Sequence, residues 1–537
     1  MCRGPRFSRA HASMTAVVGR VVYGVAALLL VVSLIGLRAA TRDVFHYPVE
    51  LPNGAPALVY EPGSERGWGE PPRPDAQFPV VVLAHGFASN AGTVSTLARH
   101  LARAGYAVIT PEFRGHGRNR EPFLYRAGDV SPGLVDDIGA AVLFARTEPH
   151  LDGTRIAVAG HSMGGHAALA YGGHDPSVAA VIGIAGGAYP KGPYDAPNVL
   201  LVWGSRDSSR RHIRLREVGA ELAGRERLVL DRTYGDAARG SAVRLSEVAG
   251  AGHLTVIYSR ETARRILAWL ETTLGVGAVR ARAPGFDGRF GWCGLGLLAQ
   301  IVLLWGLVRA LAPLLPHGSL PQIRHPLRAL GLLFAALVVT LLGLAGVDPH
   351  WSRGPLGFVP LVGGRDLIAF LALVGTLLCV WLARNERIKW LALRDLRTYL
   401  GAAVLVGFGY LTLGSFSQAF WDLWPTPQRL PWGIVCSVLL LPYFGALEWL
   451  LRGPGRRGVW LPLLGKLLTL AILLGGAAIG LLPDAMVLSL AVLVPAFLFF
   501  ELFAYRLSRV TGVPWLAALF QAAWLGLLLA SFFPLDA

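Results

Sequence analysis

The stretch Gly160-His161-Ser162-Met163-Gly164-Gly165 is the part of the sequence that decides the predicted fold. It follows a short apolar run at 156–159 and opens a small-residue pattern at 166–171 that is typical of a helix. A serine between glycines, on a sharp turn from strand to helix, is the G-x-S-x-G pattern of a nucleophile elbow. The glycines allow the backbone to turn tightly around a strained serine. Because the chain holds 65 glycines, the motif needs support from its context.

Residues 45–275 predict an α/β domain with a mostly parallel sheet, because strand-like runs alternate with helical patterns. The run PVVVLA at 79–84 is continuously apolar, as expected of a strand buried on both faces. Residues 45–51 and 56–61 predict an opening hairpin. Further strands are predicted at 106–110, 155–159, 179–185, 198–203 and 243–249, and helices at 90–104, 132–146, 163–173, 209–223 and 260–274.

Two residues that follow predicted strands complete a candidate catalytic site with Ser162. Asp207 ends the motif Gly204-Ser205-Arg206-Asp207, and His253 ends Gly250-Ala251-Gly252-His253. Because the loops at the carboxyl ends of parallel strands emerge on one edge of a sheet, we expect the three side chains to meet there. In such a site the histidine takes the proton of the serine hydroxyl and the acid orients the histidine.

The same sheet edge supplies a candidate oxyanion hole. The motif His85-Gly86-Phe87 directly follows the predicted strand at 79–84. We predict that the backbone N–H groups of Phe87 and Met163 point at the oxyanion that develops when a carbonyl is attacked. Loss of one such donor typically costs about 2.7–4 kcal/mol of transition-state stabilisation. Because the histidines and acids have no metal-ligand spacing, we expect neither a metal nor a cofactor.

Hydrophobic segments flank this domain on both sides. Of the 537 residues, 53% are hydrophobic and 16% are charged, against about 25% charged residues in typical soluble domains. Residues 16–38 predict a transmembrane anchor; a cleaved signal peptide is the alternative. Residues 291–534 predict an all-α membrane domain of about eight helices. The apolar stretches lie at 292–312, 327–347, 367–383, 398–419, 432–451, 461–482, 486–505 and 514–533.

The distribution of positive charge predicts the orientation in the membrane. With residues 1–15 in the cytoplasm and nine spans, 15 arginines and lysines fall in cytoplasmic segments and 3 in short external loops. Because positive residues favour the cytoplasmic side, the domain of 45–275 is predicted to lie outside the cytoplasm. The first group is Arg3, Arg6, Arg9, Arg324, Arg328, Arg384, Arg387, Lys389, Arg394, Arg397, Arg452, Arg456, Arg457, Arg506 and Arg509; the second is Arg353, Arg365 and Arg429.

The remaining charges allow further interpretations. The net charge of +16 comes mostly from arginines in loops between apolar runs, so we expect no nucleic-acid binding. The four cysteines match no zinc or redox pattern. Glu448, Lys466 and Glu501 lie inside predicted spans. They either snorkel or pair for structural reasons, or they form a functional polar cluster.

Five motifs together resemble the α/β-hydrolase superfamily and occur in that family's order. They are His85-Gly86-Phe87, Phe113-Arg114-Gly115-His116-Gly117, the elbow at 160–165, Gly204-Ser205-Arg206-Asp207 and Gly252-His253. The resemblance is closest to the monoglyceride lipase/serine aminopeptidase-like and dienelactone hydrolase-like branches. It implies Ser162 as nucleophile, Asp207 as orienting acid and His253 as general base, and it implies that His85, His116 and His161 orient loops.

The sequence departs from this family pattern in three places. Glu112 stands where these branches usually have an aspartate, at a generally structural position. The connection at 186–197 is short where a lid domain is often inserted, so a minimal lid is expected. The site is then either open or covered by external loops of the membrane domain. Asp231 and Asp236 lie in an inserted segment and are reserve candidates for the acid.

The sequence therefore predicts an extracytoplasmic, multi-pass membrane serine hydrolase that cleaves carboxylic esters through an acyl-enzyme. The expected substrate is an ester or acyl compound, with lipids among the candidates. A peptidase or an acyltransferase with the same triad is an alternative. A transporter or sensor with an accessory hydrolase domain is another, and a catalytically inactive binding fold is a further one. The sequence does not predict the oligomeric state.

Overall fold

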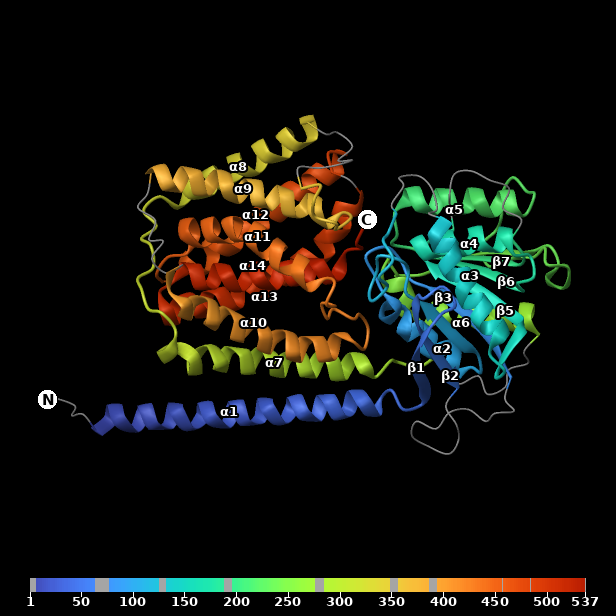
Figure 1. Ribbon diagram of the computed structural model, residues 1–537, viewed down its shortest axis with the longest axis horizontal. Coiled ribbons are helices and arrows are strands. Elements are labelled where there is room, and N and C mark those ends of the chain that lie inside the picture. Colours follow the sequence, from blue (N-terminus) through green and yellow to red (C-terminus); the bar gives the residue numbers. More distant parts are fainter. Residues whose placement is uncertain are drawn as a thin grey trace. The chain divides into compact units, whose positions relative to one another are not determined.

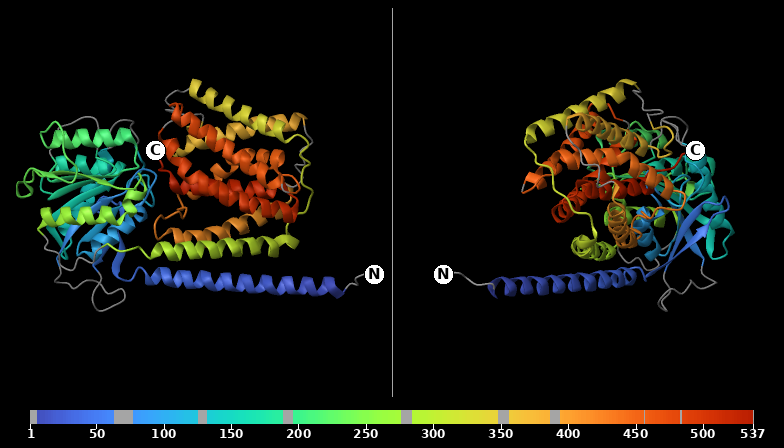
Figure 2. Two further views of the ribbon diagram at one scale, coloured as in Figure 1. Left: turned by 180° about the vertical axis from the view of Figure 1, so that it is seen from behind. Right: turned by 60° about the vertical axis from the view of Figure 1, so that its left-hand side comes forward.

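The computed structural model describes residues 6–62, 77–124, 132–187, 196–275, 284–347, 356–385, 394–455, 457–482 and 484–536. The chain divides into two compact units (Figures 1 and 2). The α/β unit comprises Gly36–Phe290, Ser417–Asp422 and Phe532–Ala537. The helical unit comprises Met1–Ile35, Gly291–Phe416 and Leu423–Ser531. Two short segments that the predicted membrane domain of 291–534 includes, wholly or in part, thus belong to the α/β unit.

Among the described residues, nine strands form one sheet in the order β1-β2-β4-β3-β5-β6-β7-β9-β8. The six strands from β4 to β9 in this order are parallel, and β1, β2 and β8 pair antiparallel at the two edges. The hairpin and the mostly parallel sheet are confirmed; the short strand β8 was not predicted. The strands are Val44–Glu50, Pro56–Pro62, Phe78–Ala84, Ala107–Pro111, Leu151–His161, Ala180–Ile184, Val199–Gly204, Thr233–Tyr234 and Val243–Val248.

Helices cover both faces of the sheet (Figure 1). One face carries α3, α4 and α5, and the other carries α2 and α6, so the central strands are buried on both sides, as their continuous apolar runs predict. The side chains of Leu83, Leu97, Ile266 and Trp269 belong to the core beneath α2 and α6. The helices α2 to α6 are Ser95–Arg103, Pro132–Thr147, Met163–His174, Ser209–Leu222 and Arg260–Leu274.

Serine caps fix where two of these helices begin. The Oγ atom of Ser208 accepts the backbone N–H of Arg211, and the Oγ atom of Ser259 accepts that of Glu261. Such caps satisfy donors that have no partner inside the helix. Because the capping residue Ser208 directly follows Asp207, this cap also fixes the turn that carries the candidate acid.

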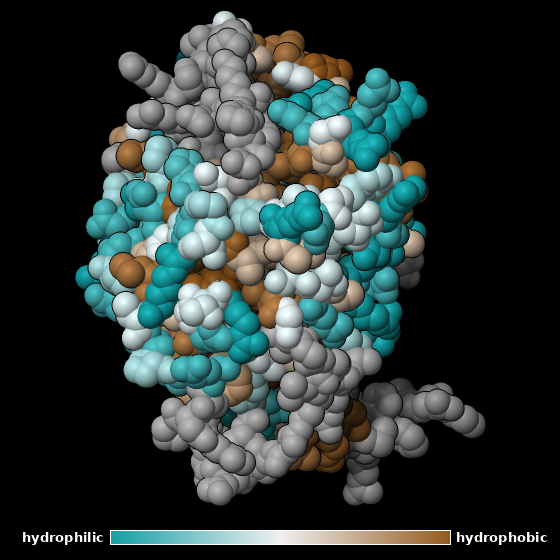
Figure 3. All heavy atoms as spheres, turned by 90° about the vertical axis from the view of Figure 1, so that its right-hand side faces the viewer, coloured by the Kyte–Doolittle hydropathy of each residue, from teal (hydrophilic) through white to brown (hydrophobic). Residues whose placement is uncertain are grey.

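One face of the α/β unit is mostly hydrophilic among its described residues. Figure 3 shows this face, on which hydrophilic residues cover most of the area and apolar residues form smaller areas between them. A core of buried apolar side chains lies around the sheet, although several large apolar residues, such as Leu143, Ile213 and Val229, are exposed. This distribution agrees with the predicted soluble domain between hydrophobic segments.

The helical unit contains α7 to α14 and most of α1. Each of the nine predicted spans coincides with a helix. Among the described residues, eight helices are long and apolar enough to cross a membrane: α1, α7, α8, α9, α10, α11, α12 and α14. The bounds of α1 and of α7 to α14 are Arg6–Ala39, Arg289–Leu311, Pro326–Val347, Gly364–Asn385, Leu396–Ser417, Leu430–Leu451, Arg457–Ala478, Asp484–Thr511 and Pro514–Phe532.

Charged side chains inside the helical unit form a buried, paired cluster. The guanidinium of Arg452 donates to Glu448 Oε2 at 2.7 Å and to Glu501 Oε2 at 3.0 Å. Lys466 Nζ donates to Glu501 Oε2 at 2.7 Å, and Gln521 Nε2 donates to Glu448 Oε1 at 3.0 Å. All five residues are buried. These side chains are thus buried and paired, and do not snorkel, and two carboxylates balance two cations.

Candidate active site

Ser162 lies on a strained turn between β5 and α4. Its backbone has φ 53° and ψ −115°, a conformation that residues with a side chain rarely adopt. Backbone hydrogen bonds on both sides maintain it: Ser162 N donates to Ile184 O at 2.9 Å, and Ser162 O accepts from Gly165 N at 3.0 Å. The turn thus has the geometry of the predicted nucleophile elbow.

The glycines of the elbow are required by close backbone contacts. A Cβ atom on Gly164 would lie 2.7 Å from Ala84 O and still closer to His85 O. A Cβ atom on Gly160 would lie 2.7 Å from Gly165 N. Neither position has room for a side chain, because the neighbouring atoms belong to the backbone. The elbow therefore packs directly on the end of β3, where the His85-Gly86-Phe87 motif begins.

The structure brings Ser162, Asp207 and His253 together in one hydrogen-bonded line. His253 Nε2 lies 3.0 Å from Ser162 Oγ, and His253 Nδ1 lies 2.9 Å from Asp207 Oδ2. Asp207 follows β7 and His253 follows β9, and these strands are parallel neighbours. The side chain of Asp207 is 2% exposed and that of His253 is 19% exposed. The carboxylate is thus buried while the imidazole stays accessible.

The surroundings of Asp207 stabilise its ionised form. Burial alone would raise the pKa of this carboxyl group, but the hydrogen bond from His253 and the charges of His253 and Arg211 outweigh burial and lower the pKa to about 2. Oδ1 accepts the backbone N–H of Ser208 at 2.7 Å and also accepts from the guanidinium of Arg211. Arg211 is not among the residues predicted from the sequence, although its spacing of four residues from Asp207 is a recognisable helix pairing signal.

Two histidines of the motifs hold the loops around the site. His161 Nε2 donates to the backbone carbonyl of His253 at 2.9 Å. His85 Nε2 accepts the N–H of Phe113 at 3.1 Å, while His85 Nδ1 donates to Gly86 O at 2.8 Å. Burial lowers the pKa of His85 to about 4 and that of His161 to about 3. Both rings are therefore neutral near pH 7, as the accepting role of His85 requires.

The candidate oxyanion donors come from two places in the sequence, since Met163 belongs to the elbow and Phe87 follows the end of β3. A Cβ atom on Gly86 would lie 3.4 Å from Ser162 Cβ and 3.1 Å from His161 Nδ1, so the backbone preceding Phe87 approaches the serine closely. Met163 is the first residue of α4, where backbone N–H groups have no partner inside the helix. Their role as oxyanion donors stays a prediction.

The reserve acids lie elsewhere. Asp231 accepts from Ser246 Oγ at 2.7 Å and pairs with Arg265, and Asp236 accepts the N–H of Ala238 at 2.9 Å. Asp207 is therefore the acid in contact with His253. The predicted short connection at 186–197 falls largely on residues 188–195, which lie outside the described residues. Within the described part of the chain, no group of three or more His, Cys, Asp or Glu side chains is placed to hold a metal ion.

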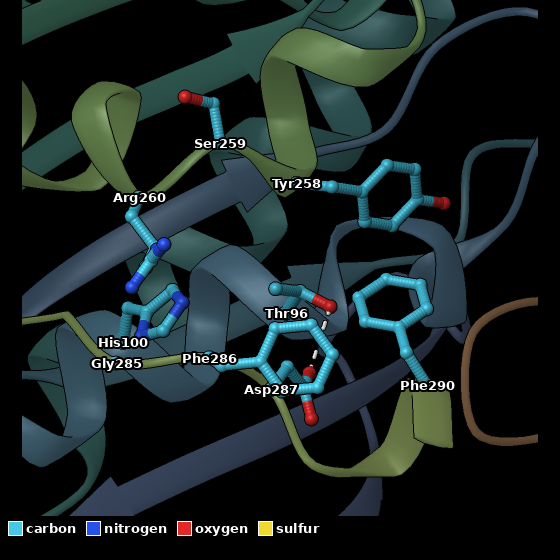
Figure 4. A pocket seen from close by; sticks show the side chains of 9 residues that line it. All are labelled: Thr96, His100, Tyr258, Ser259, Arg260, Gly285, Phe286, Asp287 and Phe290. Carbon is cyan, nitrogen blue, oxygen red and sulfur yellow. Dashed lines mark hydrogen bonds between the residues drawn. The ribbon is translucent and has the colours of Figure 1, made fainter. Parts of the chain in front are cut away.

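A pocket of about 230 Å³ lies in the α/β unit but contains none of the three candidate catalytic residues. Figure 4 shows His100 and Arg260 towards one end and the rings of Tyr258 and Phe290 towards the other. In this pocket Thr96 Oγ1 donates to Asp287 Oδ2 at 3.0 Å. Its walls come from α2, the start of α6 and residues 285–290. Ser162, Asp207 and His253 therefore lie outside this pocket.

Known proteins resemble the α/β unit. Residues 75–250 match the family described as serine aminopeptidase, S33. The monoacylglycerol lipase of Mycolicibacterium smegmatis is 40% identical over 97 residues, which are 18% of this chain and 33% of that protein. Epoxide hydrolase A of Mycobacterium tuberculosis is 41% identical over 68 residues, which are 12% of this chain and 21% of that protein. The matches thus span a third or less of the length of these two relatives.

Solved structures give two further similarities, both with low scores. A membrane phospholipase A has a TM-score of 0.31 and 19% identity, over 51% of this chain and 100% of that chain. A Klebsiella pneumoniae protein described as a dienelactone hydrolase has a TM-score of 0.30 and 18% identity, over 42% and 98%. The family match and the sheet topology carry the assignment: this part of the chain is an α/β-hydrolase domain. The resemblance seen in the sequence is thereby confirmed, together with the accompanying helices of membrane-spanning length.

Proposed function

We propose that the protein is a membrane-anchored serine hydrolase that cleaves carboxylic esters. The observation that carries this proposal is the line from Ser162 through His253 to Asp207, with hydrogen bonds of 3.0 and 2.9 Å, at a strained elbow. A nucleophile, a base and an orienting acid within hydrogen-bond reach are the arrangement that acyl transfer through a serine requires.

The reaction follows from these contacts. His253 Nε2 takes the proton of Ser162 Oγ as the oxygen attacks the carbonyl carbon of the ester, and the N–H groups of Phe87 and Met163 stabilise the oxyanion. When the tetrahedral intermediate collapses, the imidazolium gives its proton to the leaving alcohol and an acyl-enzyme ester remains on Ser162. Water then attacks this ester with His253 as base, which releases the acid and restores the serine. Asp207 stays ionised and stabilises the imidazolium.

Esters with an apolar acyl group are the proposed substrates. The similarity to a monoacylglycerol lipase supports this class, and the apolar helices of the same chain would hold the enzyme at a lipid source. A peptidase is the second candidate, because the matching family is described as a serine aminopeptidase. An acyltransferase would use the same acyl-enzyme with an acceptor other than water.

The proposed organisation has a cytoplasmic segment at 1–15, an anchor at 16–38, a hydrolase domain at 45–275 outside the cytoplasm and a membrane domain at 291–534. The asymmetry of 15 against 3 positive residues supports this orientation. It can be tested with an Arg210→Cys variant, because residue 210 is exposed at the start of α5. Labelling of this cysteine in intact cells by a membrane-impermeant maleimide is expected; labelling only after cell lysis would contradict the orientation.

The proposed activity is tested with the full chain in detergent, using p-nitrophenyl esters of different chain lengths in water enriched in oxygen-18. We expect release of acid that carries the heavy oxygen, and loss of this activity in Ser162→Ala. Acyl transfer to an added lipid without labelled acid would favour the acyltransferase. Turnover of aminoacyl amides but not of esters would favour the peptidase. Turnover retained by Ser162→Ala would contradict all three activities, because each of them uses Ser162 as the nucleophile.

A further inference from the structure

Two segments from late in the sequence belong to the α/β unit and contact loops next to the candidate active site. The 417–422 loop begins at Ser417, the last residue of α10, and the 532–536 segment begins at Phe532, the last residue of α14. Both neighbouring helices are candidate membrane spans. Both segments belong to the same compact unit as the sheet.

The 532–536 segment is joined to the loop after β4 by a pair of backbone hydrogen bonds. Leu535 N donates to Gly115 O at 2.9 Å, and Leu535 O accepts from Phe123 N at 2.8 Å. Leu535 is buried. Gly115 has φ +72°, and a Cβ atom there would lie 2.5 Å from Leu535 O. The two backbones thus approach each other as closely as glycine permits.

Aromatic contacts continue from this bridge to the candidate oxyanion loop. The ring of Phe123 lies 6.0 Å from that of Phe87 and 5.1 Å from that of His116, measured between centroids. The rings of Phe87 and His116 are also 6.0 Å apart. Phe123 and His116 are buried, so neither ring has room to turn away. Leu535 is therefore connected to Phe87 through Phe123, whose backbone bonds Leu535 and whose ring contacts Phe87.

The 417–422 loop contacts Asn90, which lies shortly after Phe87, and it also contacts the 532–536 segment. Asn90, three residues after Phe87, donates from Nδ2 to Asp422 O at 3.0 Å. Trp421 stacks on Phe532 with ring centroids 4.8 Å apart and an angle of 26° between the planes. The 417–422 loop therefore contacts both the chain after Phe87 and the segment that holds Leu535.

We propose that Leu535 is a positioning residue for ester hydrolysis: its two backbone hydrogen bonds hold Phe123 against Phe87 and so place the Phe87 N–H for the oxyanion. This inference rests on the proposed function. An oxyanion donor must lie within hydrogen-bond distance of an oxygen whose negative charge develops only as the tetrahedral intermediate forms, so its displacement lowers kcat more than it changes KM. Because α14 runs directly into this segment, a helix of membrane-spanning length is covalently continuous with the element that positions the donor.

The test compares Leu535→Pro with Leu535→Ala in the full chain. Proline lacks the N–H that bonds Gly115, whereas alanine keeps both backbone hydrogen bonds and loses only side-chain packing. We measure kcat and KM for one p-nitrophenyl ester, together with the apparent Tm. We expect the proline variant to lose about tenfold to a hundredfold in kcat with KM within about threefold, since a misplacement of about 1 Å can cost about a hundredfold. The alanine variant is expected to keep kcat within about threefold.

A second pair of variants covers the case in which Leu535→Pro does not fold. Phe123→Ala removes the ring that contacts Phe87, and Phe123→Leu keeps an apolar side chain of similar length there. We expect the alanine variant to lower kcat and the leucine variant to recover most of it. Equal kcat in both members of each pair that folds would overturn the inference. Absence of ester turnover in the unchanged protein would instead reject the proposed function, so the two failures are distinguishable.

Discussion

The Asp207→Asn variant tests which acid orients His253. Oδ1 of Asp207 accepts from Ser208 N and from Arg211, while Oδ2 faces His253 Nδ1 at 2.9 Å. In the variant, the two donors on the Oδ1 side select the amide oxygen. The amide nitrogen must then take the place of Oδ2 and donate to His253 Nδ1. The imidazole proton is thereby forced onto Nε2, the atom that should accept the proton of Ser162.

The magnitude follows from this tautomer change. A histidine that carries its proton on Nε2 is not a base for the serine, and an asparagine in this position lowers kcat about 10⁴-fold in triads of this kind. That factor corresponds to about 5.4 kcal/mol of lost transition-state stabilisation. KM is expected to change little, because Asp207 does not contact the ester in the proposed mechanism. Folding should be retained, since asparagine has nearly the size and shape of aspartate.

The assay is kcat for a p-nitrophenyl ester at pH 7 to 8, with Asp231→Asn and Asp236→Asn as matched controls. Neither control residue is hydrogen-bonded to His253, so both variants should keep kcat within about threefold. A kcat for Asp207→Asn within about tenfold of the unchanged protein would refute the reasoning, given the 10⁴-fold loss expected. A large loss in either control would point to a different acid.

Three further predictions concern the elbow, the buried charges and the response to pH. Gly164→Ala should lower kcat about a hundredfold, because its Cβ would lie 2.7 Å from the Ala84 carbonyl oxygen and would displace the serine; ester kinetics measure this. Arg452→Gln should destabilise the helical unit by about 3–5 kcal/mol, because buried Glu448 loses its cation and Glu501 keeps only Lys466; its apparent Tm should fall well below that of the exposed control Arg457→Gln. His85 and His161 have folded pKa values of about 4 and about 3, below the ordinary value of 6.5, so the unfolded chain binds more protons at mildly acidic pH. Stability should therefore fall as the pH drops from 6.5 towards 4, by up to about 1.4 kcal/mol per pH unit and group, and an apparent Tm that stays constant over this range would contradict this prediction.

Local sequence patterns were sufficient for most of the fold. The runs at 79–84 and 199–203 are continuously apolar because both faces of the central strands are covered by helices. Strand β8 escaped prediction because two residues, Thr233 and Tyr234, form no periodic pattern. The candidate triad could be predicted once the strands were, because each of its members follows a predicted strand and these strand ends lie at the same edge of a parallel sheet.

The parts of the site that escaped prediction depend on contacts between distant residues. The hydrogen bonds from Leu535 to Gly115 and Phe123 join positions more than 400 residues apart, and such pairings leave no periodic signal. In the sequence, the 532–536 segment looks like the end of the apolar span that precedes it. Its place beside the loop after β4 is decided by packing, which the pattern of one segment does not encode.

The most direct test of the central claim is the reaction of the full chain with a fluorophosphonate probe, followed by mass spectrometry of its peptides. If Ser162 is the nucleophile, the probe will be found on Ser162, the labelling will require native protein, and Ser162→Ala will not be labelled. Labelling of Ser162→Ala to the same extent as the unchanged protein, or a label on a different residue, would contradict the account.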